Sequence, residues 1–126
     1  MKDDVRGYKK NLGAIGEKIA EEYLRKEKGF KVITKNYTCP IGEIDMIASD
    51  GKTLVFVEVR TSSMPSAVYA EESIGSHKQK KLRLLASYYL KAKKLGDCLC
   101  RFDAVIVLLE KETFLVREIR HFKSAF

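Results

Sequence analysis

The stretch Leu54–Val59 constrains the fold most, because it is apolar throughout except for one glutamate. Side chains of a strand alternate between the two faces of a sheet, so a nearly continuous apolar run predicts a strand covered on both faces. Residues 49–52 (Ser-Asp-Gly-Lys) form a turn signal just before it. The run therefore predicts the central strand of a sheet that has further layers above and below it.

The remaining chain supplies those layers. Residues 11–28 and 76–94 carry apolar side chains at helical spacing, whereas the other apolar runs are short and strand-like. The predicted elements are a helix over 11–28, strands over 30–37, 43–48 and 53–60, an irregular loop over 61–75, a helix over 76–94, and strands over 102–109 and 113–119. The order αβββαββ in 126 residues predicts one α/β domain over residues 1–126, in which helices flank a mixed sheet.

Glu58 interrupts the central apolar strand. An ionised carboxylate that is buried without a partner costs several kcal/mol, so its presence there needs a reason. Glu58 and Arg60 share one face of the strand because they are two residues apart. An isolated Glu-x-Arg pattern is more typical of a structural ion pair than of a catalytic site.

A second acidic pattern occurs in the preceding strand, where Glu43 and Asp45 are predicted to share a face and Ile44 and Met46 the other. The short turn between the two strands predicts an antiparallel hairpin. Asp45 on the same face as Glu58 would place two carboxylates together, and Mg²⁺ is commonly bound by one or two carboxylates plus water and phosphate oxygens.

Positive charge is concentrated in the second predicted helix. The chain has 24 Lys and Arg against 17 Asp and Glu, a net charge of +7. Residues 78–94 contain no acid, and their basic side chains are Lys78, Lys80, Lys81, Arg83, Lys91, Lys93 and Lys94. The first four are the predicted contacts to a nucleic-acid backbone. The alternative is a solvated helix face that keeps the protein soluble.

Other polar residues have simpler readings. Ser76-x-x-Gln79 matches a capping box, in which Gln79 reaches back to the start of the helix. Asp103 follows Arg101 on the same strand face, which favours a local ion pair over a metal ligand, and the two histidines receive no role. The odd number of cysteines predicts free thiols in a cytoplasmic protein. No signal peptide and no membrane-spanning run is expected.

The acidic motifs are specific when taken together. Gly42-Glu43-Ile44-Asp45 followed by Val55-Phe56-Val57-Glu58-Val59-Arg60 resembles the PD-(D/E)xK signature of the restriction-endonuclease-like superfamily. The chain more closely resembles the YraN-like family, small uncharacterised bacterial proteins described as endonucleases. Matching features span nearly the whole chain: Gly13-x-x-Gly16-Glu17, Asn36, the two acidic motifs, Lys78, Lys81, Arg101-Phe102-Asp103 and Ala125-Phe126.

The resemblance implies a restriction-endonuclease-like fold. It also implies an endonuclease that depends on Mg²⁺ or Mn²⁺ and acts on DNA. Recognition of a particular DNA structure, as in resolvases, is among the activities that it implies. Asp45 and Glu58 match the metal-binding residues of the signature. Glu17 matches a helix carboxylate that some resolvase-like members direct at the metal, and its alternative is a plain surface glutamate. Related nucleases often dimerise, so a homodimer is also among the expectations from the resemblance.

Arg60 departs from the signature, which usually has lysine there. An arginine stays protonated and cannot act as a general base, although it can hold a phosphate oxygen. Either the reaction proceeds without that lysine, or the same fold binds nucleic acid without cutting it. A third alternative is an interaction protein, whose basic helix docks an acidic partner and whose carboxylates are structural.

Overall fold

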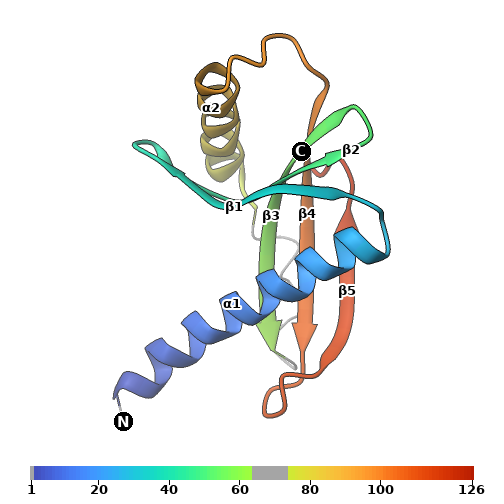
Figure 1. The fold of residues 1–126 in the computed structure, drawn as a ribbon. Coiled ribbons are helices and arrows are strands. Elements are labelled where there is room, and N and C mark those ends of the chain that lie inside the picture. Colours follow the sequence, from blue (N-terminus) through green and yellow to red (C-terminus); the bar gives the residue numbers. More distant parts are fainter. Residues whose placement is uncertain (1, 64–73) are drawn as a thin grey trace.

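The computed structural model describes residues 2–63 and 74–126, and Figure 1 shows their arrangement. In these residues two helices and five strands follow one another in the predicted order αβββαββ. Their bounds are α1 Lys2–Lys26, β1 Lys31–Cys39, β2 Gly42–Asp50, β3 Thr53–Ser63, α2 Ser76–Ala92, β4 Cys100–Leu109 and β5 Val116–Phe122. In the described residues no helix is both long enough and apolar enough to span a membrane.

The strands form a single mixed sheet in the order β1-β2-β3-β4-β5. The pairs β1–β2, β2–β3 and β4–β5 are antiparallel, whereas β3 and β4 are parallel. The parallel pair requires a crossover, and α2 lies within that connection. The predicted α/β fold with a mixed sheet is confirmed, and its topology is consistent with a restriction-endonuclease-like fold.

The two helices cover opposite faces of the sheet, as Figure 1 shows for α1 in front of β3 and β4. Val55 and Val57 of β3 pack in the cluster that also contains Leu24 of α1. Leu54 and Phe56 pack instead with α2, whose predicted apolar stripe is buried. The central strand is therefore covered on both faces, as its apolar run predicts.

α1 approaches β3 closely at Gly16. A Cβ atom added at Gly16 would lie 1.8 Å from Oγ1 of Thr61, which is closer than any real contact. Only glycine permits this approach, because it has no side chain beyond Cα. The contact fixes the height of α1 over the end of β3, and hence the position of the neighbouring Glu17.

Several predicted boundaries are wrong. α1 begins at Lys2 rather than Asn11, because the charged residues before Asn11 show too few apolar positions for a helical period. β3 continues to Ser63, paired with β4, and the rest of the predicted loop to residue 73 lies outside the described residues. β5 begins at Val116, three residues late, because Phe114 adopts a φ of 58° and donates its amide to Glu110 in the preceding turn.

The predicted capping box is also wrong. Gly75 is the cap residue of α2, and no side chain caps the helix. Ser76 is already helical, so its hydroxyl cannot serve as the cap acceptor. The Gln79 side chain instead donates to the backbone carbonyl of Ile74 at 3.0 Å, which ties the helix to the segment before it.

Candidate functional site

Glu58 is buried on the α2 face of β3, with only 5% of its surface exposed. Its Oε2 lies 2.8 Å from Nζ of Lys78, which projects from the first turn of α2. Nη2 of Arg60 is 3.6 Å from the same oxygen. The predicted Glu58–Arg60 pair therefore exists, but the shorter contact to the carboxylate comes from another element.

Asp45 reaches the same region because β2 separates from β3. The β2–β3 pairing begins at Met46, opposite Val57, whereas β2 pairs with β1 from Gly42 onward. Beyond that point Oδ2 of Asp45 accepts a hydrogen bond from the Val59 amide at 2.8 Å. The side chain thus takes the place of a strand carbonyl, and this orients its carboxylate.

The Asp45 and Glu58 carboxyl groups interact directly. Burial, followed by the hydrogen bond and the charge of Glu58, raises the pKa of Asp45 to about 8, against the opposing hydrogen bond from Val59. Two carboxylates in contact disfavour double ionisation, and the raised pKa of Asp45 means that this residue holds a proton near neutral pH. A cation that displaced this proton would remove the same repulsion.

The predicted alternation of β2 is wrong at its beginning. Ile44 packs in the α2-side cluster, whereas Met46 packs in the α1-side cluster, although the two residues are two positions apart. A strand that pairs on one side alone twists more freely than one held between two neighbours. The twist changes the direction of side chains in the segment that carries Asp45.

Glu17 lies half-buried on α1 and belongs to the edge of the same electrostatic cluster. Burial and then the charge of Glu43 raise its pKa, with a smaller contribution from Glu58, while Asn36 and Lys35 oppose the shift. Glu17 therefore senses the carboxylate pair, but its nearer neighbours are Glu43 and Asn36. Its predicted contribution to metal binding stays a prediction.

Asn36 is a site residue that the residue patterns did not identify. It lies within β1 at a φ of 53°, a conformation that asparagine tolerates better than most side chains. Its side chain hydrogen-bonds Glu17. The available signal was its place in the family resemblance, since a single asparagine in a strand has no pattern of its own.

The four predicted nucleic-acid contacts do not form one stripe. Lys78 is engaged with Glu58, and the Lys81 side chain packs over Gly42 at the start of β2. The Arg83 guanidinium lies 5.2 Å from the ring centre of Phe102 and 6.0 Å from that of Phe126. Lys80 is exposed. Contact of these residues with nucleic acid stays a prediction.

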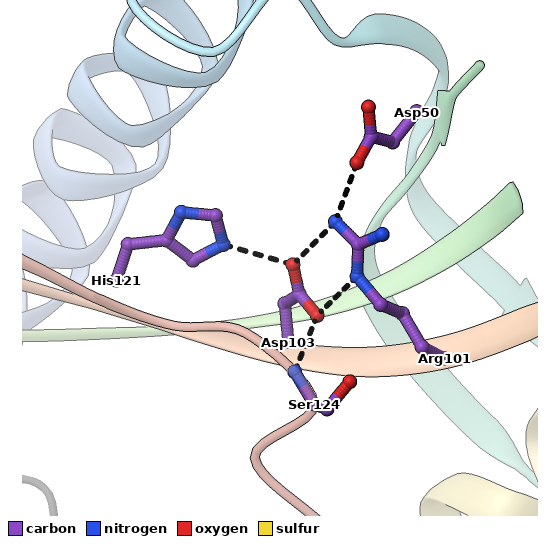
Figure 2. A network of polar contacts seen from close by, with 5 residues as sticks. All are labelled: Asp50, Arg101, Asp103, His121 and Ser124. Carbon is purple, nitrogen blue, oxygen red and sulfur yellow. Dashed lines mark hydrogen bonds and ion pairs between the residues drawn. The ribbon is translucent and has the colours of Figure 1, made fainter.

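A second buried polar cluster lies on the α1 face of the sheet around Asp103 (Figure 2). Nε of Arg101 donates to Oδ1 of Asp103 at 2.9 Å, and Nη2 of Arg101 lies 3.0 Å from Asp50 at the end of β2. The local ion pair expected from the sequence is confirmed. Asp103 is fully buried, so these partners offset the cost of removing its charge from water.

Two further groups complete the Asp103 cluster. Nε2 of His121 lies 2.8 Å from Oδ2 of Asp103, and the amide of Ser124 donates to Oδ1 at 3.0 Å. Burial raises the pKa of Asp103, but hydrogen bonds from His121, Arg101 and Ser124 outweigh this effect and hold the pKa below its usual value. The cluster joins β2, β4, β5 and the residues after β5, and we read it as structural.

The described residues hold no large cluster of side chains of the kinds that bind metals. Within residues 2–63 and 74–126, no three His, Cys, Asp or Glu side chains gather closely enough to hold an ion by themselves. Asp45 and Glu58 supply hard oxygen donors of the kind that Mg²⁺ and Mn²⁺ prefer. The three cysteines are free thiols, as expected.

These features define a class: an α/β protein whose topology is consistent with a restriction-endonuclease-like fold, and whose central strand β3 carries, near its middle, one member of a carboxylate pair flanked by cations. Residues 16–107 match the model of the uncharacterised protein family UPF0102. The chain belongs to this family, the group introduced above as YraN-like.

Similar proteins cover almost the whole chain. The UPF0102 protein of Pelotomaculum thermopropionicum is 44% identical over 118 residues, which are 94% of this chain and 97% of the relative. The UPF0102 protein of Moorella thermoacetica is 39% identical over 94% of this chain and 97% of its own length. That of Geotalea uraniireducens is 39% identical over 100% of this chain and 97% of its own length.

Proposed function

We propose that this protein is a metal-dependent nuclease that hydrolyses phosphodiester bonds in DNA. The observation that carries the proposal is the contact between Asp45 and Glu58 where β2 separates from β3, with Lys78 at 2.8 Å from Glu58. A pair of carboxylates in contact, of which Glu58 is buried and Asp45 half-buried, is a costly arrangement for structural purposes alone. Its resemblance to the PD-(D/E)xK signature supports DNA as the substrate.

Asp45 and Glu58 would hold Mg²⁺ or Mn²⁺. Burial and then the neighbouring Glu58 carboxyl raise the pKa of Asp45 to about 8. The pair fits such a cation because a divalent charge would favour ionisation of both carboxylates. When bound, the cation would supply a nucleophilic water and neutralise charge on the phosphate. The Val59 amide holds Asp45 in place for this role.

Lys78 would provide the cation that the signature usually takes from the position of Arg60. The Lys78 ammonium reaches the Glu58 carboxylate from α2. The site therefore has a lysine, although residue 60 is an arginine. Lys78 would orient the attacking water and stabilise charge on the phosphate. Arg60 would hold a phosphate oxygen through its donors.

The test combines metal binding with cleavage. Calorimetric titration with Mg²⁺ and Mn²⁺, with and without DNA, would compare the wild type with Asp45→Asn and Glu58→Gln, and Glu112→Gln would serve as an exposed carboxylate control. A panel of labelled duplex, flap, junction and single-stranded DNA would be incubated with each variant. We expect cleavage by the wild type and control, and none by the two site variants.

The alternative function gives a different result. The protein would bind DNA without metal-dependent cleavage if Lys78 and Arg60 serve only to neutralise Glu58. Cleavage that survives both Asp45→Asn and Glu58→Gln would come from a contaminant or another site. Either result would contradict the proposal, and absence of DNA binding together with absence of metal binding would favour an interaction protein.

A further inference from the structure

A groove lies between the C-terminal half of α1 and the edge strand β1, which are neighbours in Figure 1. It has a volume of about 700 Å³. The charged residues that line it are Glu21 and Arg25 of α1 and Lys31 and Lys35 of β1. Three of them are cationic and one is acidic, so the groove has a net positive charge.

The acidic residue of the groove holds two of its cations in position. Oε1 of Glu21 lies 2.9 Å from Nζ of Lys35, and Oε2 lies 3.4 Å from Nη1 of Arg25. Hydrogen bonding and charge from Lys35, assisted by Arg25, hold the pKa of Glu21 below its usual value. Lys31 is exposed at the start of β1. The arrangement presents three cations along one groove while the acid stays ionised beneath them.

The groove begins beside Glu17, at the edge of the carboxylate cluster. Lys35 acts electrostatically on Glu17, and the next residue, Asn36, hydrogen-bonds the same carboxyl group. Glu21 follows Glu17 by one turn of α1. From Glu17 to Arg25 the helix rises by about 12 Å, at 1.5 Å per residue, so the cations extend away from the site along a defined line.

We propose that this groove, defined by Arg25, Lys31 and Lys35, binds the phosphate backbone of the nucleic acid whose reacting phosphate lies at Asp45 and Glu58. The inference rests on the proposed function and adds the path of the nucleic-acid backbone across the protein surface. A line of separated cations that starts beside Glu17, at the edge of the carboxylate cluster, matches a chain of phosphates. The predicted contacts on α2 diverge, whereas these three residues share one groove.

The experiment compares two triple variants with the same change of charge. Arg25→Gln/Lys31→Gln/Lys35→Gln removes the groove cations, and Lys91→Gln/Lys93→Gln/Lys94→Gln removes three exposed cations at the end of α2. Both are made in the Asp45→Asn background, so that substrate stays intact. Binding of fluorescent single-stranded and duplex DNA is measured by anisotropy over a range of salt concentrations. Thermal melting of each variant checks that it is folded.

We expect the groove variant to bind at least tenfold more weakly and to lose about 2 to 3 from the slope of log Kd against log salt, near 0.7 to 0.9 for each phosphate contact removed. The control variant should retain the slope. Equal loss in both variants, or no loss in the groove variant, would overturn the proposal. Equal competition by polyglutamate and DNA of matched charge would overturn the assignment to nucleic acid.

The two proposals fail in different ways. If the wild type cleaves DNA through Asp45 and Glu58 but the groove variant binds normally, the groove proposal is wrong and the nuclease stands. If the groove variant loses DNA binding but the wild type cleaves no DNA with either metal, the groove proposal is supported and the nuclease proposal is wrong. If the wild type binds no DNA, the groove proposal is wrong.

Discussion

Lys78 Nζ lies 2.8 Å from Glu58 Oε2, although the two residues are separated by the segment that crosses from β3 to α2. The lysine thereby faces a carboxylate that also contacts Asp45 of β2 and Arg60 of its own strand. In the proposed nuclease, a lysine from a helix replaces one from the strand. The position of an ammonium in space matters to the chemistry, whereas its position in the sequence does not.

Replacement of Lys78 should therefore reduce catalysis. We expect Lys78→Gln to lower kcat for DNA cleavage on the order of 100-fold, the usual cost of removing one charge-stabilising donor. Metal binding should persist, because the Asp45 and Glu58 carboxylates stay in place. Lys91→Gln, an exposed change in the last turn of α2, is the control. Equal kcat values for the two variants would contradict the role given to Lys78.

The raised pKa of Asp45 predicts how stability depends on pH. The unfolded chain releases the Asp45 proton near pH 3.8, whereas the metal-free folded protein holds it up to about pH 8. The folded state therefore binds more protons between these values, and its free energy of unfolding falls as pH rises through this range.

Asp45→Asn should remove that part of the pH dependence, because asparagine does not titrate and can still accept the Val59 amide. Urea unfolding of both proteins at pH 5 to 9, with a chelator present, would give the difference between their free energies of unfolding. We expect the variant to gain stability relative to the wild type as pH rises. A constant difference over this range would show that the Asp45 pKa is not raised.

The close approach of α1 to β3 predicts opposite effects at two glycines of one helix. Gly16→Ala should destabilise the protein by about 1 to 3 kcal/mol, since its Cβ would overlap Thr61. Gly13→Ala meets nothing within 4 Å, so it should stabilise the helix by up to about 1 kcal/mol. Chemical denaturation measures both. Similar effects at the two positions would contradict the packing described.

The buried cluster around Asp103 predicts a large structural effect. Asp103→Asn should cost about 3 to 5 kcal/mol, because it leaves the Arg101 charge, 12% exposed, without its main partner. Glu118→Gln, which breaks the exposed Glu118–Arg120 pair, should leave stability nearly unchanged. Thermal or urea unfolding would compare them. If DNA cleavage fell with Asp103→Asn while stability did not, the cluster would belong to the catalytic machinery instead.

Much of the architecture was predictable because it depends on short-range periodicity. The apolar run around Glu58 predicted a doubly covered central strand, and the helical spacing of Leu82 and Tyr89 predicted the buried face of α2. The ion pair of Arg101 with Asp103 followed from strand alternation. These features need only the period of one element, which the sequence displays directly.

The sequence by itself determined the order of elements, the faces of β3 and the presence of acidic residues in two adjacent strands. Tertiary structure alone decided that β2 separates from β3 so that Asp45 meets Glu58, that Lys78 completes the site, and that Lys35 lines a basic groove. Contacts of this kind depend on strand twist and on the placement of helices over the sheet. Those quantities arise from packing among all the elements, so no local pattern contains them.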